Sequence, residues 1–268
     1  MDIFVCIKQV PHPDHFSKIT LDPETKTIRR EGVPVVINPA DKHAIEQALR
    51  IREERSGKVT VLTMGPPQAR KALEEALAMG ADEAFLLCDR LFAAADTLAT
   101  ASTLASGIRT MGHFDLILCG DKTVDSGAAQ VGPQLAQLLG LPCATNIDTI
   151  RFEDEKNLVV RQAIERGHVT SEIPLPALLS VTRQINKPRL ASAFGILAVA
   201  DKEIRELCCP DIGADPNMVG LKGSPTAVVD TVERRTGRKA EILTGPPEET
   251  VRQALRKIQQ LGGADLLP

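Results

Sequence analysis

Four short apolar runs alternate with helical patterns in the first half of the chain, and this alternation limits the folds that it can adopt. The runs are Ile3–Lys8, Lys58–Thr63, Ala84–Cys88 and Asp115–Cys119. Near-continuous apolar strands separated by helices are typical of a parallel sheet that is covered on both faces. The sequence therefore predicts an α/β fold with a parallel, Rossmann-like sheet.

The helices of this alternation begin at recognisable signals. The first opens at Asn38-Pro39, which form an N-cap and first-turn pair. The second opens near Pro66-Pro67, and the third near Asp96. Each is followed by apolar residues three or four positions apart, so each is expected to bury one face.

Two β-ribbons are expected to decorate this core, around residues 19–28 and 146–163, and a later strand is expected at Ala177–Thr182. Beyond about Asn186 the pattern weakens, and only Glu248–Leu261 has helical periodicity. An irregular C-terminal segment of this kind usually packs against another protein, such as a partner subunit.

Composition excludes several classes of protein. The net charge is −3 and Trp and Tyr are absent, which disfavours nucleic acid as a partner. No apolar run approaches the roughly 20 residues of a membrane span, and the first residues are typical of a β-strand and not of a signal peptide. The six cysteines show no C-x-x-C spacing, as expected of a cytoplasmic protein with reduced thiols.

The passage from the fourth strand into the next helix carries the strongest functional signal. The run Phe114–Cys119 ends at Gly120, a short polar loop follows, and an amphipathic helix begins near Val131. Small residues let the backbone approach a ligand closely, and a helix start offers free N–H groups to a phosphate. Neither G-x-G-x-x-G nor a P-loop motif is present, so backbone and small polar groups are expected to hold the phosphates.

Five segments are expected to meet at the carboxyl edge of the sheet, where open α/β sheets bind ligands. They are Cys6–Val10, Asn38–Asp41, Met64–Pro66, Ala95–Thr100 and Gly120–Val131. Taken singly, each is ordinary loop and cap chemistry. Taken together, they predict a nucleotide site.

Individual roles in this loop remain open. Asp125 is expected to cap the following helix, with Ser126 as the alternative, and Lys122 either neutralises phosphate or is solvated.

His12 and His15 lack an acidic ligand cluster, so no metal site is expected, and no catalytic residue is assigned. Any chemistry is therefore expected to come from a cofactor.

Several segments, in order, resemble the β (small) subunit of an electron transfer flavoprotein. They are Val5–Pro11, Ile37–Pro39, Thr63–Pro67, Ala78–Ala84 and the loop 119–133, which ends in Ala-Gln-Val-Gly-Pro. The resemblance covers nearly the whole chain. It implies the adenine-nucleotide α-hydrolase-like form of the Rossmann-like fold.

The resemblance also implies a function. Ordinary members hold AMP in this subunit, whereas the bifurcating kind holds a second FAD there, and Asp89–Thr100 resembles the bifurcating kind. The implied protein is a heterodimer with an α subunit that carries another FAD. It transfers electrons between NADH, ferredoxin or flavodoxin, and an acyl-CoA dehydrogenase, by electron bifurcation. Oxidoreductase activity is expected only together with the α subunit and the dehydrogenase partner. The alternative is a subunit in which AMP is structural and all redox work lies in the α subunit.

Domain 1–190 would then bind the nucleotide, and residues 191–268 would form a partner-recognition segment and an arm that packs on the α subunit. The expected cofactor-binding residues lie in the five edge segments: Cys6, Asn38, Asp41, Met64, Asp96, Thr97, Thr100, Gly120, Lys122, Thr123, Val124, Asp125, Ser126, Gly127, Ala128, Ala129, Gln130 and Val131.

The chain departs from the family pattern at three loop positions. Asp121 stands where a basic residue is usual, and Gly127 and Ala128 replace an acidic residue and a threonine, so weaker flavin binding or an altered potential is expected. The segment Arg189–Val199, which follows Lys187-Pro188, lacks the usual lysines, and this indicates a specialised redox partner. A third class, a stand-alone nucleotide-binding or ATP-hydrolysing protein, is disfavoured by the missing P-loop and the long tail.

Overall fold

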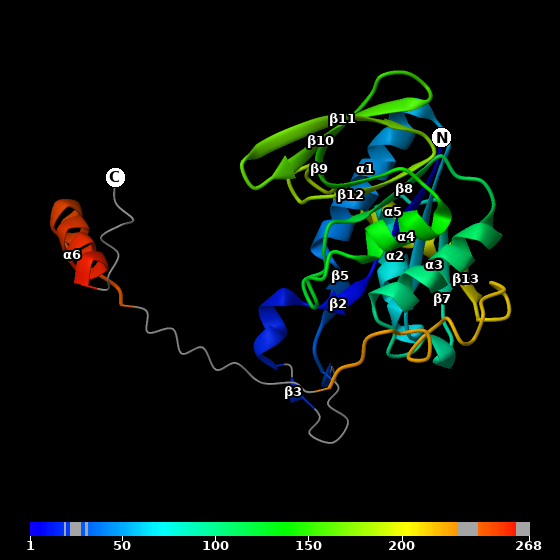
Figure 1. Ribbon diagram of the computed structural model, residues 1–268, viewed down its shortest axis with the longest axis horizontal. Coiled ribbons are helices and arrows are strands. Elements are labelled where there is room, and N and C mark those ends of the chain that lie inside the picture. The colour runs from blue at the N-terminus through cyan, green and yellow to red at the C-terminus, as the bar shows by residue number, and fades with distance from the viewer. Residues whose placement is uncertain (19, 22–27, 30–31, 230–240, 261–268) are drawn as a thin grey trace. The chain divides into compact units, whose positions relative to one another are not determined.

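The computed structural model describes residues 1–18, 20–21, 28–29, 32–229 and 241–260 (Figure 1). The chain divides into two compact units, Met1–Val229 and Asp230–Pro268. In the second unit the described element is α6 (Pro247–Gln260), which carries apolar side chains at helical spacing, among them Val251, Leu255 and Ile258.

A nine-stranded sheet forms the centre of the first unit, in the order β11-β10-β9-β12-β8-β1-β6-β7-β13. Its strands are β1 (Asp2–Cys6), β6 (Lys58–Met64), β7 (Glu83–Leu87), β8 (Leu116–Gly120), β9 (Cys143–Phe152), β10 (Asn157–Ile164), β11 (Gly167–Pro174), β12 (Ala177–Val181) and β13 (Ile204–Leu207). Neighbouring strands are parallel along the part β9-β12-β8-β1-β6-β7-β13 of this order. They are antiparallel along β11-β10-β9. The expected α/β fold with a mainly parallel sheet is confirmed.

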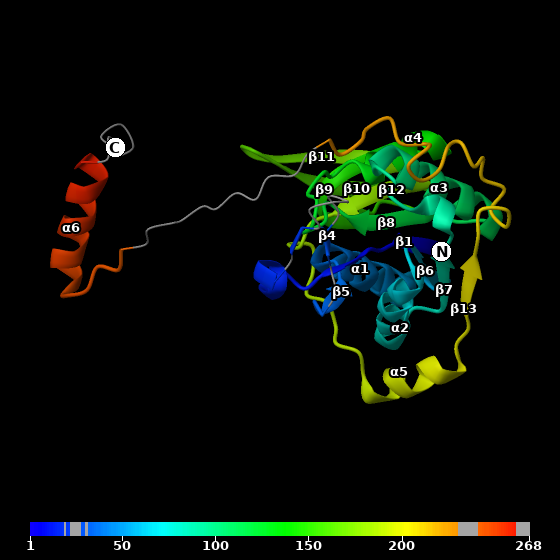
Figure 2. The ribbon, with the colours of Figure 1, turned by 90° about the horizontal axis from the view of Figure 1, so that it is seen from below.

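Helices cover both faces of this sheet, as Figure 2 shows. Helices α1 (Pro39–Arg55) and α2 (Arg70–Met79) pack on one face, and α3 (Thr97–Met111) and α4 (Val131–Leu139) pack on the other. Neighbouring strand residues point to opposite faces: Val5 packs in the core of α1 and α2, whereas Phe4 packs in the core of α3 and α4. Two buried faces explain why the strands are apolar at nearly every position.

The helix starts follow the sequence signals closely. Pro39 is the first residue of α1, and Asp96 caps α3 by accepting hydrogen bonds from the N–H groups of Leu98 and Ala99, both at 3.0 Å. Helix α2 begins at Arg70, after the 3-10 turn η2 (Pro67–Ala69), so it starts slightly later than the proline pair suggested.

Both expected β-ribbons are present. Strands β9 and β10 form the second ribbon, and β11 extends it by a strand that the sequence analysis missed because its residues are largely exposed. In the first ribbon β3 (Thr20–Leu21) pairs with β4 (Ile28–Arg29), and the turn between them lies outside the described residues. Two further short strands, β2 (Gln9–Pro11) and β5 (Val35–Ile37), pair beside the 3-10 turn η1 (Pro13–Lys18).

The segment after β12 is more ordered than its sequence suggests. It forms α5 (Ala193–Ala198), the 3-10 turn η4 (Val199–Asp201) and β13, which adds a parallel strand next to β7. Residues 191–229 therefore lie in the first compact unit, and their role as a partner-recognition segment stays a prediction. Within the described ranges, no helix is long and apolar enough to cross a membrane.

Candidate functional site

The carboxyl ends of β1, β6, β7 and β8 lie at one edge of the sheet because these strands are parallel. Helices α1 to α4 begin at or close to this edge, and hydrogen bonds join its loops. The Lys8 Nζ atom donates to the Asp125 carboxylate, and the Thr97 hydroxyl donates to the Gln130 side-chain oxygen at 3.0 Å. The segments after β1 and β8 and the start of α3 are thus brought together, as the sequence predicted.

Asp41 is the centre of this arrangement. One carboxylate oxygen accepts the Gly120 N–H at 3.0 Å and the Asn38 amide at 3.0 Å, and the other accepts the Lys8 N–H at 2.7 Å. Only 4% of the residue is exposed. The end of β1, the first turn of α1 and the end of β8 therefore converge on a single carboxyl group.

Asn38 extends this connection into the loop after β8. Its side-chain nitrogen donates to the Lys122 carbonyl at 3.0 Å, and its side-chain oxygen accepts the Val124 N–H at 3.1 Å. Asn38 makes no side-chain cap bond within its own helix. Its polar atoms instead bind the backbone of the loop, so Asn38 and Asp41 together hold the loop against α1.

Gly120 is required where the loop leaves β8. A Cβ atom at this position would lie 2.4 Å from an Asp41 carboxylate oxygen and 2.7 Å from the Ala40 Cβ atom. This close approach of the backbone is to α1, and the expected approach of the loop to a ligand stays a prediction.

The predicted capping role of Asp125 and Ser126 is wrong. Helix α4 begins at Val131, and its N-cap, Gln130, makes no side-chain cap bond. The Asp125 carboxylate instead pairs with the Lys8 Nζ atom at 2.7 Å, and the Ser126 hydroxyl contacts the Thr123 hydroxyl at 2.8 Å. Helix α4 begins at Val131, as expected, so these side chains lie too early in the chain to cap it.

The start of α4 is consequently open. The first N–H groups of a helix have no partners within it, and here no side chain of the N-cap satisfies them. The preceding residues are all exposed: Ser126, Gly127, Ala128, Ala129 and Gln130. Backbone donors and the positive end of the helix dipole are available to an anion at this position.

Asp96 differs from the expectation that it is simply a cofactor contact. One carboxylate oxygen caps α3, and the other accepts the Thr226 N–H at 3.1 Å and its hydroxyl at 2.8 Å. The Asp96 N–H also donates to the Ser224 hydroxyl at 2.8 Å. Burial raises the pKa of this carboxyl, but these hydrogen bonds outweigh it and hold the pKa below its usual range. Asp96 thus fastens a late segment of the chain beside the site, which no local sequence signal reveals.

The remaining predicted residues are placed at different depths. Cys6 is buried, and its side chain lies in the core beneath α3 and α4, opposite Cys119 of β8. Burial and the Asp41 charge raise the pKa of Cys6 to about 12, so its thiol stays protonated. Met64 and Thr100 are half-buried, and Lys122 is exposed. This exposure is compatible with both predicted roles of Lys122, neutralisation of phosphate and solvation. Lys8 is the polar residue of this edge that the sequence analysis did not single out.

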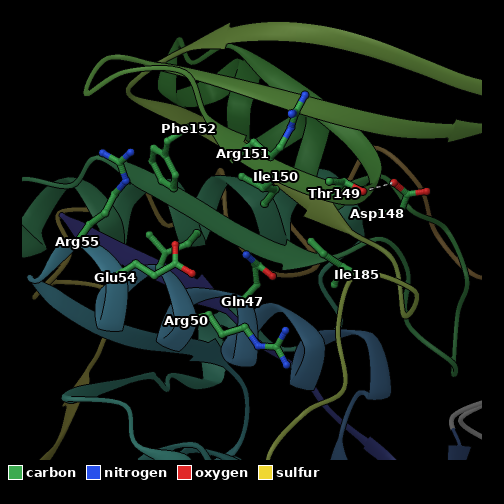
Figure 3. A pocket seen from close by; sticks show the side chains of 11 residues that line it. Gln47, Arg50, Glu54, Arg55, Asp148, Thr149, Ile150, Arg151, Phe152 and Ile185 are labelled. Atoms are coloured by element: carbon green, nitrogen blue, oxygen red, sulfur yellow. Dashed lines mark hydrogen bonds between the residues drawn. The ribbon is translucent and has the colours of Figure 1, made fainter.

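The two described pockets lie elsewhere. A hollow of about 550 Å³ separates α1 from β9, where Figure 3 shows Arg55 beside Phe152 at one end and Asp148 at the other. The Arg55 guanidinium lies 3.8 Å above the Phe152 ring. A hollow of about 300 Å³ is lined by His12, Lys42 and neighbouring residues. Neither of these two hollows is lined by a residue of the predicted cofactor set.

Large apolar side chains are also exposed on one side of the segment around α5. Leu190 is 91% exposed, Phe194 85% and Leu197 72%. Such a group of exposed large apolar residues is typical of a protein contact site.

This segment is held firmly although its outer face is bare. Arg189 pairs with Glu46 at 2.8 Å and with Glu53 at 2.5 Å, both on α1. Gly195 approaches the end of α2 so closely that a Cβ atom would lie 2.2 Å from the Ala78 carbonyl oxygen. On the other side, Lys202 donates to the Ala81 carbonyl oxygen at 2.5 Å.

The chain is similar to known proteins over most of its length. The family model described as "Electron transfer flavoprotein domain" matches residues 25–211. The electron transfer flavoprotein subunit beta of Thermoanaerobacterium thermosaccharolyticum is 47% identical, over 96% of this chain and 98% of the relative. The caffeyl-CoA reductase-Etf complex subunit CarD of Acetobacterium woodii is 45% identical over 91% of this chain and 92% of the relative. Protein FixA of Azorhizobium caulinodans is 42% identical over 85% of this chain and 83% of the relative.

Proposed function

Because this chain belongs to the electron transfer flavoprotein family as a β subunit, we propose that it binds FAD at the carboxyl edge of its sheet. It pairs with an α subunit that holds another FAD. The complex passes electrons between NADH, ferredoxin or flavodoxin, and an acyl-CoA dehydrogenase-type partner by electron bifurcation. The subunit would act in the cytoplasm.

The observation that carries this proposal is the loop after β8. Its first half is fastened to α1 through Asn38 and Asp41, and its second half leads to the uncapped start of α4. The loop also meets the start of α3 through the Thr97–Gln130 hydrogen bond. The uncapped start of α4, next to a small-residue loop, supplies backbone N–H groups for a pyrophosphate without a P-loop, whereas the Asp96 carboxylate occupies the Leu98 and Ala99 N–H groups at the start of α3.

The relatives support the choice of partners. One of them is named as a subunit of a caffeyl-CoA reductase-Etf complex, and this favours an enzyme acting on a CoA thioester as the partner here. The exposed apolar face of Leu190, Phe194 and Leu197 is a suitable docking surface for that enzyme. The apolar stripe of α6 is suited to packing on the α subunit.

AMP as a structural nucleotide is the second candidate. The chain has no Trp or Tyr with which to stack on an isoalloxazine ring. Both carboxylate oxygens of Asp96 are already engaged within the protein. Each of these observations favours the smaller nucleotide, which needs only the adenosine and phosphate contacts.

Identification of the bound nucleotide tests both candidates. The complex with its α subunit would be purified, denatured, and its released nucleotides counted per heterodimer by chromatography and mass spectrometry. Two FAD per heterodimer supports the main proposal, and one FAD with one AMP supports the alternative. A complex with FAD in the α subunit and no adenine nucleotide in the β subunit overturns both.

We expect the isolated subunit to retain flavin poorly. Without large aromatic residues of its own, it would place the ring on backbone and aliphatic surface near Met64 and Cys6, or against the partner chain. Flavin retained after desalting would be measured for the isolated chain and for the complex. Near-stoichiometric retention by the isolated chain would contradict this expectation.

A further inference from the structure

Asp41 has no oxygen left over for a ligand. Its two carboxylate oxygens accept three N–H groups, from Lys8, Asn38 and Gly120, and the residue is almost fully enclosed. These donors belong to three different parts of the chain. The sequence analysis expected Asp41 to contact the cofactor, whereas this geometry gives it an indirect role.

The hydrogen bonds around Asp41 are suited to the ionised carboxylate. A carboxylate is only an acceptor, and every group that faces its oxygens here is an N–H donor. A proton on either oxygen would turn one acceptor into a donor that opposes an N–H group. A proton on Oδ1 would oppose the Gly120 and Asn38 N–H groups, which hold the loop after β8 directly or through Asn38, whereas a proton on Oδ2 would oppose the Lys8 N–H group.

Burial acts in the opposite direction. It raises the pKa of Asp41 to about 7, although the hydrogen bonds from Asn38, Lys8 and Gly120 and the Lys8 charge lower it. The other titratable groups that face it are the Cys6 thiol from β1 and the Cys119 thiol from β8. Burial raises the pKa of both thiols, so they remain neutral. The Lys8 ammonium group is itself paired with Asp125.

We propose that Asp41 is a positioning residue whose ionised form alone holds the loop 120–125 in the nucleotide-binding conformation, so that nucleotide retention depends on pH. This inference rests on the proposed function, since it assigns the control of the same site. It makes the site sensitive to acidification near neutral pH.

The expected size of the effect follows from the population of the ionised form. A ligand that binds only this form has its apparent affinity reduced by the fraction present. With a pKa of about 7, affinity is expected to fall by about tenfold between pH 8 and pH 6.

Stability is expected to change in the other direction. Burial raises the pKa of Asp41 in the folded state above its ordinary value of 3.8, so the folded state binds the proton more tightly than the unfolded state. The contribution of Asp41 to stability is present at low pH and is lost as pH rises from about 4 to about 7. A merely structural role predicts this stability trend and no loss of nucleotide affinity on acidification.

The test uses the complex with its α subunit, freed of nucleotide at the β site and titrated calorimetrically with AMP and, separately, with FAD at pH 6, 7 and 8. Asp41→Asn keeps an acceptor but directs a donor at one N–H group. We expect it to bind about tenfold more weakly than the wild type at pH 8, with little change between pH 8 and pH 6. The matched control is Asp154→Asn, because the Asp154 carboxylate also accepts backbone N–H groups, from Lys156 and Asn157, but lies in the turn between β9 and β10. It should keep the pH dependence of the wild type.

Failure of this inference is distinct from failure of the proposed function. Nucleotide binding with no dependence on pH in the wild type, or with the wild-type dependence in Asp41→Asn, overturns the positioning role alone. If neither nucleotide binds the wild type at any pH, the proposed function falls with it.

A second measurement covers an Asp41→Asn variant that does not fold. Hydrogen exchange of residues 120–125 in the wild-type complex would be measured at pH 6 and pH 8 and corrected for the intrinsic rates. Greater protection at pH 8 supports the inference, and equal protection overturns it.

Discussion

Gly120→Ala is expected to abolish tight nucleotide binding and to destabilise the subunit by about 2–6 kcal/mol. The new methyl group would lie 2.7 Å from the Ala40 Cβ atom and 2.9 Å from the Ala40 carbonyl carbon, so the first turn of α1 and the end of β8 would have to separate. Overpacking of this kind costs roughly 1–3 kcal/mol. A similar amount is lost when a buried hydrogen bond is broken, and here the Gly120 N–H would move away from Asp41.

Calorimetric titration with AMP and FAD, together with thermal unfolding, would measure these effects. Gly107→Ala, within α3, is the matched control. Its new Cβ atom would lie 2.9 Å from a terminal methyl group of Leu87, which is the far end of a flexible side chain. We expect this control to change stability by less than about 1 kcal/mol, since alanine favours the helix, and to leave nucleotide affinity unaltered. Equal nucleotide affinity in Gly120→Ala and wild type would show that the loop does not bind the nucleotide.

Gly195→Ala is expected to lower electron transfer to the dehydrogenase-type partner by at least about tenfold, which corresponds to 1.4 kcal/mol of lost docking free energy. Helix α5 packs on α2. A Cβ atom at Gly195 would lie 2.2 Å from the Ala78 carbonyl oxygen, so α5 would have to move away. The exposed apolar side chains Phe194 and Leu197 would then be displaced relative to the rest of the subunit.

Steady-state reduction of the partner, with the complex as the varied substrate, would measure this loss as an increase in KM. Hydrogen exchange over residues 190–202 should rise, and nucleotide content should stay the same. Ala198→Ser is the control, because Ala198 is an exposed residue of the same helix. Unchanged KM in Gly195→Ala, despite faster exchange in α5, would exclude this helix as the docking surface.

Local sequence patterns were sufficient to predict the core of this fold. The four apolar runs became β1, β6, β7 and β8, and the signals at Pro39 and Asp96 mark true helix starts. These features depend on residues close together in sequence, namely apolar periodicity, a first-turn proline and a capping carboxylate. Burial on both faces of the sheet made the strand signal strong.

Features that depend on distant contacts were missed. Asp125 pairs with Lys8, which is 117 residues away, whereas it was expected to cap the helix that begins only a few residues later. Likewise, β13 has a short polar pattern, and only its pairing with β7 identifies it as a strand. The predicted segments do meet at this edge of the sheet, but that the edge binds a nucleotide stays a prediction. The direction in which Asn38, Asp41 and Asp96 use their polar atoms was not accessible from spacing alone.

The position of β12 has a consequence for synthesis of the chain. It lies between β8 and β9, and its last residue, Val181, accepts the Asp121 N–H at 2.9 Å at the start of the loop. A nascent chain that ends before Ala177 therefore leaves one side of β8 unpaired and the β9–β10 ribbon without its hydrogen bonds to the rest of the sheet. Exposed strand edges of this kind invite pairing with other chains. Translation must deliver β12 before the loop made earlier can acquire its final shape, which makes the interval between the two a vulnerable stage of biogenesis.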